Sequence, residues 1–474
     1  MSSEQINTSH PVGRVSPQGV TRQLASDAEN ANVGLRCANP TYGAEWPEVN
    51  LKSITSILGD GLQGTPEYDD TGTHSFINGN NLNNGKIVIN SNTRSTSIIE
   101  YEKFKKELND RTLLVSINGT LGNVALYNGE KVILGKSACY FNVLKDVDKQ
   151  FVRYVLTGEL FQKYIHNLAT GSTIKNVSLK LMRDFTFRLP PLSLQKKISS
   201  TLLALDDRIA LLRETNATLE AIAQALFKSW FVDFDPVRAK QQGRAPEGMS
   251  DATAALFPDS FEESAVGLVP RGWKVSAFTD TMDVIGGGTP KTSVSEYWNG
   301  TIPWFSVVDA PATSDVFVVD TEKYITEAGL NNSSTKLLPA GTTIISARGT
   351  VGRLALVGRD MAMNQSCYGL RGKAGDDYFT YFSTYRLVET LKRRTHGSVF
   401  DTITRDTLAG VSIVYPDVLV IQAFENLMSP VMERLKENLM QAQTLATLRD
   451  TLLPRLISGQ LRLPEADAKI METI

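Results

Sequence analysis

The segment from Gly129 to Ser137 has residue types that could bind a phosphate group. It reads Gly-Glu-Lys-Val-Ile-Leu-Gly-Lys-Ser, and in a phosphate-binding P-loop two glycines precede a lysine and a hydroxyl residue so that backbone amides surround the phosphate. Here five residues separate the glycines instead of four, the run between them is β-branched, and no helix obviously follows. We therefore do not predict a nucleotide site at this segment.

Other combinations of reactive residues are equally incomplete. The string Asn39-Pro40-Thr41-Tyr42 has most of the Asn/Asp-Pro-Pro-Tyr motif of amino-group methyltransferases, but the second proline and an upstream glycine-rich loop are missing, so we expect a turn. The histidines are dispersed, and no carboxylate and lysine cluster has nuclease spacing. The cysteines are too few and scattered for a disulfide framework or a zinc site, which favours a reducing cytosol; they are Cys37, Cys139 and Cys367. We predict no catalytic residue and no metal site.

Composition sets further limits on the function. The 474 residues are enough for two or three domains, and 42% of them are apolar, as in a globular protein. The net charge of -2 excludes a nucleic-acid binder that is basic over its whole surface, although a local basic face remains compatible with it. The sequence shows no targeting signal and no apolar run long enough to span a membrane. These features predict a soluble cytoplasmic protein.

Two long helices must position the polar segments. From Ile198 to Trp230, apolar residues recur at alternating steps of four and three, with Asn216 as the polar interruption. The same pattern returns 226 residues later, from Phe424 to Leu456, with Asn438 as its polar member and Arg449 as a departure. A helix of this length needs another long helix to pack against, so we expect the two to pair.

The chain also repeats itself outside these helices. Residues 114 to 126 align without a gap on residues 344 to 356, with six identities in thirteen positions. The same alignment matches Asn118 with Arg348, Lys136 with Asn364, and Cys139 with Cys367, and the cysteines are then interpreted as small buried strand residues. We infer a duplicated protein. Its expected parts are a leader at 1–45, a mixed domain at 46–189, a central long helix at 190–236, a connector at 237–266, a second mixed domain at 267–415, a C-terminal long helix at 416–463, and a tail at 464–474.

Several strings, in this order, resemble the specificity subunit of type I restriction-modification enzymes. The resemblance covers the chain from about Trp46 to Leu463. The strings are Arg188-Leu-Pro-Pro-Leu-Ser-Leu-Gln195, Leu226-Phe-Lys-Ser-Trp-Phe-Val-Asp-Phe-Asp-Pro236, Ala254-Ala-Leu-Phe-Pro-Asp-Ser-Phe261, Gly267-Leu-Val-Pro-Arg-Gly-Trp273 and Leu452-Leu-Pro-Arg-Leu-Ile-Ser-Gly459.

This resemblance implies an α+β fold in which two similar mixed α/β target-recognition domains, related by a pseudo-two-fold repeat, are separated by two long antiparallel coiled-coil helices. Each domain would read one half of a bipartite double-stranded DNA sequence. The helices would set the spacing and dock two methyltransferase subunits. The resemblance also implies two restriction and translocation subunits, and it assigns S-adenosylmethionine, ATP and Mg to the partners, with no cofactor in this chain.

If the resemblance holds, cations should contact phosphates, and amide, guanidinium or hydroxyl groups should contact base edges. Arg348 is the strongest candidate, because it precedes a Gly-Thr-Val-Gly turn whose glycines permit close backbone approach. The candidates in the first domain are Asn78, Asn80, Asn81, Lys86, Arg94, Lys136 and Lys175. Those in the second are Lys291, Thr292, Ser306, Asp309, Arg348, Asn364 and Arg394.

The two seam asparagines are predicted to set the register of the helix pair. In an antiparallel pair related by the repeat, Asn216 should face Asn438, and the paired amides would penalise slipped registers. Each asparagine pointing to solvent is the alternative. For the whole protein, two other functions stay open at this point, a stand-alone DNA-modifying enzyme and a coiled-coil scaffold that binds only proteins.

Overall fold

The computed structural model describes residues 46–171, 175–311, 315–394 and 402–473. The predicted leader, with its Asn39-Pro40-Thr41-Tyr42 string, lies outside the described residues. The chain divides into two compact units. The first unit combines residues up to Leu202 with those from Asp450 onward, and the second unit runs from Leu203 to Arg449.

The first unit is built mainly on antiparallel strands, of which β7, β8 and β10 are wholly buried and β2 is partly buried. Its main sheet has the order β2-β10-β7-β8, and a smaller sheet has the order β6-β3-β9, with β3 and β9 parallel. The main strands are β2 (Thr55–Asp60), β7 (Thr112–Ser116), β8 (Val124–Leu126) and β10 (Ala138–Val143). The others are β1 (Glu48–Asn50), β3 (His74–Ile77), β4 (Leu82–Asn83), β5 (Lys86–Ile87), β6 (Ser95–Thr96), β9 (Val132–Leu134) and β11 (Thr186–Arg188).

The second unit repeats this plan. Its main sheet has the order β15-β22-β19-β20-β17, and a smaller sheet has the order β18-β16-β21, again with one parallel pair. The main strands are β15 (Met282–Gly286), β17 (Phe317–Val318), β19 (Thr343–Ser346), β20 (Leu354–Val357) and β22 (Cys367–Gly372). The others are β12 (Phe261–Ser264), β13 (Gly267–Pro270), β14 (Lys274–Ala277), β16 (Trp298–Phe305), β18 (Tyr324–Ile325), β21 (Ala362–Met363) and β23 (Ser412–Tyr415).

The helices of the two units correspond as well, with one difference. The sequence pattern from Phe151 to Asn167 predicts one helix, and this prediction is wrong: the chain forms α3 (Lys149–Thr157) and α4 (Glu159–Leu168), which meet at Gly158. The extended backbone of Gly158, with φ -73° and ψ 156°, ends one helix and begins the next. In the second unit α10 (Asp377–Arg394) is continuous. The remaining short helices are α2 (Ile98–Phe104), α5 (Leu179–Asp184), α9 (Glu327–Asn331) and α11 (Arg405–Ala409).

The strand register shows that the predicted alignment of the two repeats is wrong by one residue near Cys367. Cys367 lies opposite Ser346, whereas the residue opposite the equivalent Ser116 is Ala138. Cys139 lies opposite Val115 instead. A gapless sequence match cannot detect this shift, because both neighbouring positions are buried and small. The structural counterpart of Lys136 is therefore Gln365 and not Asn364. Because Gln365 is not a lysine either, the two repeats still share no P-loop lysine.

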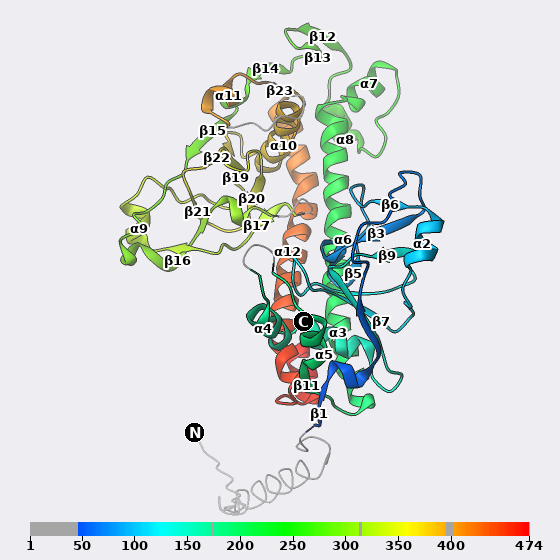
Figure 1. Ribbon diagram of the computed structural model, residues 1–474. Coiled ribbons are helices and arrows are strands. Elements are labelled where there is room, and N and C mark those ends of the chain that lie inside the picture. The colour runs from blue at the N-terminus through cyan, green and yellow to red at the C-terminus, as the bar shows by residue number, and fades with distance from the viewer. Residues whose placement is uncertain (1–45, 172–174, 312–314, 395–401, 474) are drawn as a thin grey trace, which may run out of the picture. The chain divides into compact units, whose positions relative to one another are not determined.

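The long helices form as the apolar spacing predicts. The two helices, α6 (Leu192–Phe231) and α12 (Val418–Ile457), have 40 residues each, or about 60 Å at 1.5 Å per residue. Within the second unit they run antiparallel, because Asp206 contacts Arg449 while Phe227 contacts Phe424 (Figure 1). The predicted seam residues are buried or partly buried, and those below 9% exposure include Ile198, Leu212, Ala223, Met428, Leu435 and Leu452.

The segments that flank the long helices contain more structure than the sequence predicts. The connector predicted at 237–266 contains most of α7 (Asp235–Gln241), all of α8 (Asp251–Ala255), and β12, which pairs with β13 in a hairpin. Phe234 turns the chain into α7 with a left-handed φ of 56°, and Pro236 then lies in the first turn of α7, where its missing N–H costs nothing. The predicted tail is also helical, as α13 (Leu463–Thr473). Among the described residues, no helix is both long and apolar enough to cross a membrane.

Candidate nucleic-acid interface

In the second unit, four loops meet at one end of the two sheets. Strand β15 ends opposite Tyr368, and β19 ends opposite Cys367. The parallel strands β16 and β21 end side by side at Phe305 and Met363. Backbone bonds from Gly288 to Met363 (3.0 Å) and from Asn364 to Phe305 (2.8 Å) join the loops. We call this the second loop edge; it comprises residues 287–289, 306–309, 347–351 and 364–366.

The Asp309 carboxylate stabilises the 306–309 loop through hydrogen bonds. The backbone N–H and the hydroxyl of Ser306 donate to Asp309 Oδ2 at 2.8 and 2.9 Å, and the N–H of Glu322 donates to Asp309 Oδ1 at 2.7 Å. Both Ser306 and Asp309 are partly buried. In this conformation their polar groups stabilise the loop, so a direct contact of either residue with a base stays a prediction.

Arg348 precedes a turn with the predicted glycine geometry. Gly349 and Gly352 have φ of 76° and 79°, values that favour glycine. The Ser346 hydroxyl donates to Thr350 O at 2.6 Å and accepts the N–H of Arg353 at 2.8 Å, which fixes the turn. The Arg348 side chain is exposed and makes no polar contact within the described parts of the chain.

The other second-domain candidates differ in how closely they join this edge. The N–H of Ser366 donates to Asn364 Oδ1 at 3.0 Å, so that amide also braces its loop. Lys291 and Thr292 are exposed, and the indole of Trp298 donates to the Lys291 carbonyl at 3.3 Å. The Arg394 side chain lies outside the described residues.

The first unit has an equivalent edge, held by an asparagine, a serine and a glycine. The Ser137 hydroxyl donates to Asn78 Oδ1 at 3.0 Å and accepts the N–H of Gly79 at 2.8 Å. A Cβ atom on Gly135 would lie 2.2 Å from Asn78 Oδ1, so any larger residue there would displace the Asn78 amide. The Gly-Lys-Ser string that resembles a P-loop therefore joins two loops. We call residues 78–81, 118–121 and 135–137 the first loop edge.

Asn81 is the most internal of the first-domain candidates. Its side chain is 9% exposed, donates to Val88 O at 3.0 Å and Thr93 Oγ1 at 3.2 Å, and accepts the N–H of Asn78 at 2.9 Å. These bonds hold the 88–93 segment against the edge. The candidates with exposed side chains are Asn80, Lys86, Arg94, Lys136 and Lys175.

Three of these exposed groups lie at or beside the first loop edge. The Lys175 carbonyl accepts the N–H of Gly119 at 3.0 Å, and the Arg94 carbonyl accepts the N–H of Phe76 at 2.8 Å. Lys136 lies between Gly135 and Ser137 and is exposed. The backbones of Lys175 and Arg94 are thus bonded to the edge or to the strand that leads into it, while Lys136 and Asn80 belong to the edge itself. Sequence reasoning missed Gln365 and Val308, because neither carries a motif; only their position in the repeat could have indicated them.

The two seam asparagines meet in the second unit, as predicted. Asn438 Nδ2 donates to Asn216 Oδ1 at 2.9 Å, and Asn216 Nδ2 donates to Leu435 O at 2.9 Å. Both side chains are buried, at 4% exposure for Asn216 and 2% for Asn438. Arg449 interrupts the apolar seam because it pairs with Asp206 at 2.7 Å. That the amides select the register stays a prediction.

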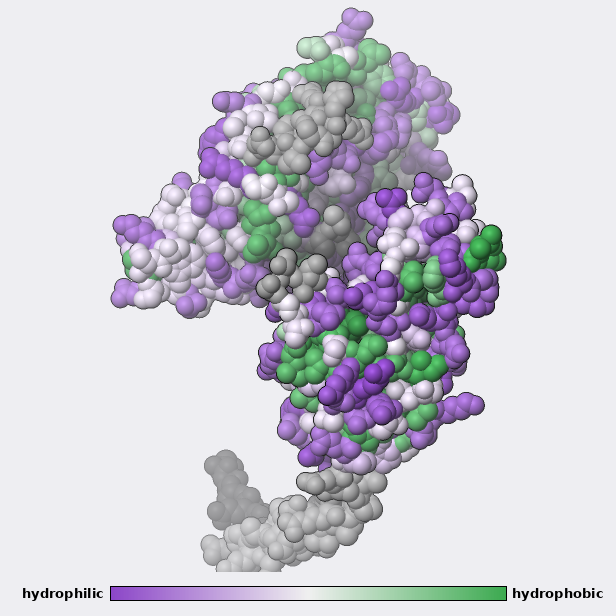
Figure 2. Space-filling model, in the orientation of Figure 1, coloured by the Kyte–Doolittle hydropathy of each residue, from purple (hydrophilic) through white to green (hydrophobic). Residues whose placement is uncertain are grey.

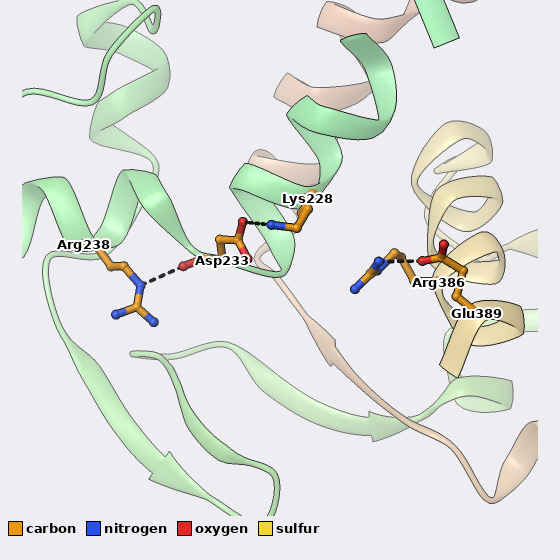
Figure 3. Close-up of polar contacts among 5 residues, drawn as sticks. All are labelled: Lys228, Asp233, Arg238, Arg386 and Glu389. Atoms are coloured by element: carbon orange, nitrogen blue, oxygen red, sulfur yellow. Dashed lines mark hydrogen bonds and ion pairs between the residues drawn. The ribbon is translucent and has the colours of Figure 1, made fainter. Parts of the chain in front are cut away.

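A small cavity of 240 Å³ lies between α6 and α10 in the second unit. Its charged lining residues already have partners, since Lys228 pairs with Asp233 and Arg386 Nη1 pairs with Glu389 at 2.6 Å (Figure 3). Figure 3 also shows Arg238 donating to the Asp233 carbonyl, at 2.8 Å. The paired charges leave little net charge to attract an ion.

The cysteines of the described chain have the environment of buried structural residues. Cys139 and Cys367 are free and buried, and burial raises the pKa of both thiols, that of Cys367 to about 12. A thiol with such a pKa is not a thiolate nucleophile at neutral pH. In the described residues, no group of three or more His, Cys, Asp or Glu side chains is arranged to hold a metal ion.

Comparison with known proteins gives consistent matches. A family model described as the type I restriction modification DNA specificity domain matches residues 44–221 and 270–424. The HindI specificity subunit of Haemophilus influenzae is 29% identical over 360 residues, which cover 66% of this chain and 77% of that protein. The MjaIX specificity subunit of Methanocaldococcus jannaschii is 24% identical over 447 residues, which cover 89% of this chain and 94% of that protein.

A solved structure shares the fold. The crystal structure of a type I restriction-modification S subunit from M. genitalium matches with a TM-score of 0.53 and 17% identity, covering 89% of this chain and 97% of that one. The two family matches include the first and second loop edges, respectively.

Proposed function

The chain belongs to the type I restriction-modification DNA specificity family, in which it is a DNA-recognition subunit, and we propose that each of its two domains reads one half of a bipartite target. The observation that carries this proposal is the pair of loop edges, which share a framework and differ in their exposed residues. Equal frameworks give both domains the same way of approaching DNA. Different residues give them different sequences to read.

The differences occur at positions of matched geometry. Asn80 in the first edge corresponds to Val308 in the second, and Asn118 corresponds to Arg348. An amide can bond to the edge of adenine, whereas a guanidinium prefers the O6 and N7 of guanine. The proposal therefore includes unlike half-sites. Lys136, Lys175 and Arg94 would bind phosphates in the first half-site.

The long helices would set the distance between the half-sites. In the second unit an aromatic cluster attaches the domain to the helix pair, with Phe227 and Phe231 of α6 against Phe379 of α10 and Phe424 of α12. In the first unit Gln195 of α6 accepts the N–H of Asp148 at 2.8 Å, just before α3. Gln195 is buried and so are the four aromatic residues, which supports a fixed distance between each domain and its helix.

Membership of the family supports a proposal about the partners. We propose that the helix pair docks two methyltransferase subunits, and that two restriction and translocation subunits complete the cytoplasmic assembly. The partners would carry out methylation with S-adenosylmethionine and cleavage with ATP and Mg, while this chain performs no catalysis.

Binding of the complex to designed duplexes tests the proposal. The chain, assembled with its methyltransferase partner, is used to select a target from random duplexes, and each half of that target is then scrambled in turn. We expect either scrambling to weaken binding strongly, with a marked salt dependence in all cases. Selection of no common sequence would favour a protein-binding scaffold. Methyl transfer to DNA by the purified chain alone, with labelled S-adenosylmethionine, would favour an enzyme.

A further inference from the structure

The second loop edge presents an aliphatic side chain that the fold does not use. Val308 is 73% exposed, more than any other large hydrophobic residue in the described part of the second unit. Its neighbour Val307 packs against the core around Phe305 and Ile344, and Val308 does not. In Figure 2 the part of this unit that contains β16 and α9 is mostly hydrophilic or neutral. Val308 is therefore an apolar side chain that the core of this unit does not use.

The loop holds this side chain in one place. Three hydrogen bonds to the Asp309 carboxylate, from Ser306 and Glu322, close the single turn of 3-10 helix that carries Val308. A β-branched side chain also has few rotamers, so the two methyl groups of Val308 have little freedom left to lose on binding. A fixed methyl group is suited to an apolar contact of defined position.

The first unit has a hydrogen-bonding group at the same place. Its loop closes in the same way, with the N–H of Asn78 donating to the side chain of Asn81 where the N–H of Ser306 donates to Asp309. Asn80 then occupies the position of Val308, and it is exposed as well. The repeat thus offers an amide at one loop edge and two methyl groups at the other.

This difference has a direct meaning in the major groove. Adenine presents N6 and N7 to an amide, whereas thymine presents a C5-methyl group that apolar side chains contact. We propose that Val308 is a specificity-determining residue that contacts the C5-methyl group of a thymine in the half-site read by the second domain. The inference rests on the proposed function and adds the base that this loop reads.

Replacing thymine with deoxyuridine tests the contact, because deoxyuridine keeps every hydrogen-bonding group and lacks only the methyl group. The complex with the methyltransferase partner is titrated with its selected target, in which each thymine is replaced in turn. At one thymine we expect wild-type binding to weaken by about three- to tenfold. The V308A variant should bind the unmodified target more weakly by a similar factor and show no further loss at that position.

A matched control separates this contact from a general effect of removing methyl groups. Val266, in the β12–β13 hairpin, is 50% exposed and far along the chain from the loop edge, so V266A should keep the full deoxyuridine penalty. Both variants should unfold at the same denaturant concentration as the wild type, since neither side chain is buried.

The outcomes distinguish this inference from the proposed function. A V308A complex that keeps the whole deoxyuridine penalty, or a wild-type complex that responds to no thymine replacement, overturns the role of Val308 and leaves bipartite recognition intact. A complex that selects no common sequence overturns the proposed function instead.

Discussion

Arg348 carries a charged, exposed side chain at the second loop edge, on a turn whose hydrogen bonds are made by other residues. The side chain of its counterpart, Asn118, is held by a hydrogen bond, because Asn118 Nδ2 donates to Asn176 Oδ1 at 3.2 Å. Where the fold does not need a side chain and the backbone position is fixed, a substitution can change the DNA sequence that is read without destabilising the protein. This is the physical reason to expect base reading from Arg348.

Replacing Arg348 with alanine should weaken binding to the selected target by about ten- to a hundredfold, the loss typical of a bidentate guanine contact, while binding to random DNA changes little. Titration of both duplexes with the complex measures the two losses. R271A, which removes an exposed arginine outside the loop edge, serves as the control. Equal losses on target and random DNA would make Arg348 a phosphate contact.

Glu425 is a partly buried titrating group on α12. Its carboxylate accepts the N–H groups of Phe379 at 2.8 Å and Tyr378 at 3.2 Å, at the start of α10. Burial raises the pKa of Glu425 to about 7 from 4.5, and the nearby Asp377 and Asp376 add to the rise while the two N–H bonds oppose it. Since the folded state then holds its proton more tightly than the unfolded state, this group's contribution to stability falls as the pH rises from about 4.5 to 7.

E425Q should therefore lose part of the pH dependence of unfolding. Glutamine cannot ionise, and its single carbonyl oxygen can accept only one of the two N–H bonds. The variant should therefore lose a pH-independent amount of stability, but relative to the wild type its stability should rise as the pH increases from 5 to 8, by at most about 3 kcal/mol. Reversible denaturant unfolding across this range measures the difference. E437Q, at an exposed position of the same helix, should follow the wild-type curve. A difference between E425Q and the wild type that does not vary with pH would contradict the expectation.

At the scale of elements, the asparagine pair is the polar exception in an apolar seam. Asn216 and Asn438 satisfy each other, and each alone would leave a buried polar group unpaired. N438A should therefore destabilise the protein by about 1–3 kcal/mol. The N216L/N438L double variant should recover that stability and accept slipped helix registers, which would broaden the range of spacer lengths that the complex binds.

Denaturant unfolding and binding to a series of spacers measure the two effects separately. The single and double variants control for each other, because only the double variant removes both amides. A double variant that keeps the spacer preference of the wild type would show that the apolar seam and the Asp206–Arg449 pair set the register without the amides.

The sequence predicted the elements whose physical signals are local and strong. The seam from Ile198 to Trp230 predicted α6 because a 3.5-residue period sustained over so many turns is characteristic of a long helix paired with another. The Gly158 break and the one-residue register of Cys367 were missed, because the first depends on one glycine's backbone angles and the second on a pairing between distant strands. Helix α13 was missed because the segment is short and carries a mixed pattern.

The sequence predicted the types of residue at the candidate site better than the role of each residue. Arg348, Asn80 and Lys136 are exposed at the loop edges, as base or phosphate contacts require. Asn81, Asp309 and Asn364 use their polar groups to hold the loops themselves. Residue type alone cannot distinguish these two uses, because the same amide or carboxylate serves either. Only the hydrogen-bond partners separate them.

At the scale of the whole molecule, the proposed function depends on a fixed spacing between two reading domains. Each domain contacts the long helices, through a hydrogen bond to Gln195 in the first unit and through Phe379 and Glu425 in the second. A paired helix resists bending and slipping in a way that a flexible linker does not. The spacer between the half-sites should therefore have one preferred length.

Adding one base pair to the spacer of the selected target should reduce binding nearly to the level of a target with one half scrambled. The added pair moves the second half-site by about 3.4 Å and turns it by about 35°, which no small side-chain adjustment can follow. Titration of the complex with spacers shortened or lengthened by one pair measures the loss, and a base change inside the original spacer is the control for altered DNA flexibility. Near-equal binding to all three spacers would mean that the domains move independently and that the helices do not act as a ruler.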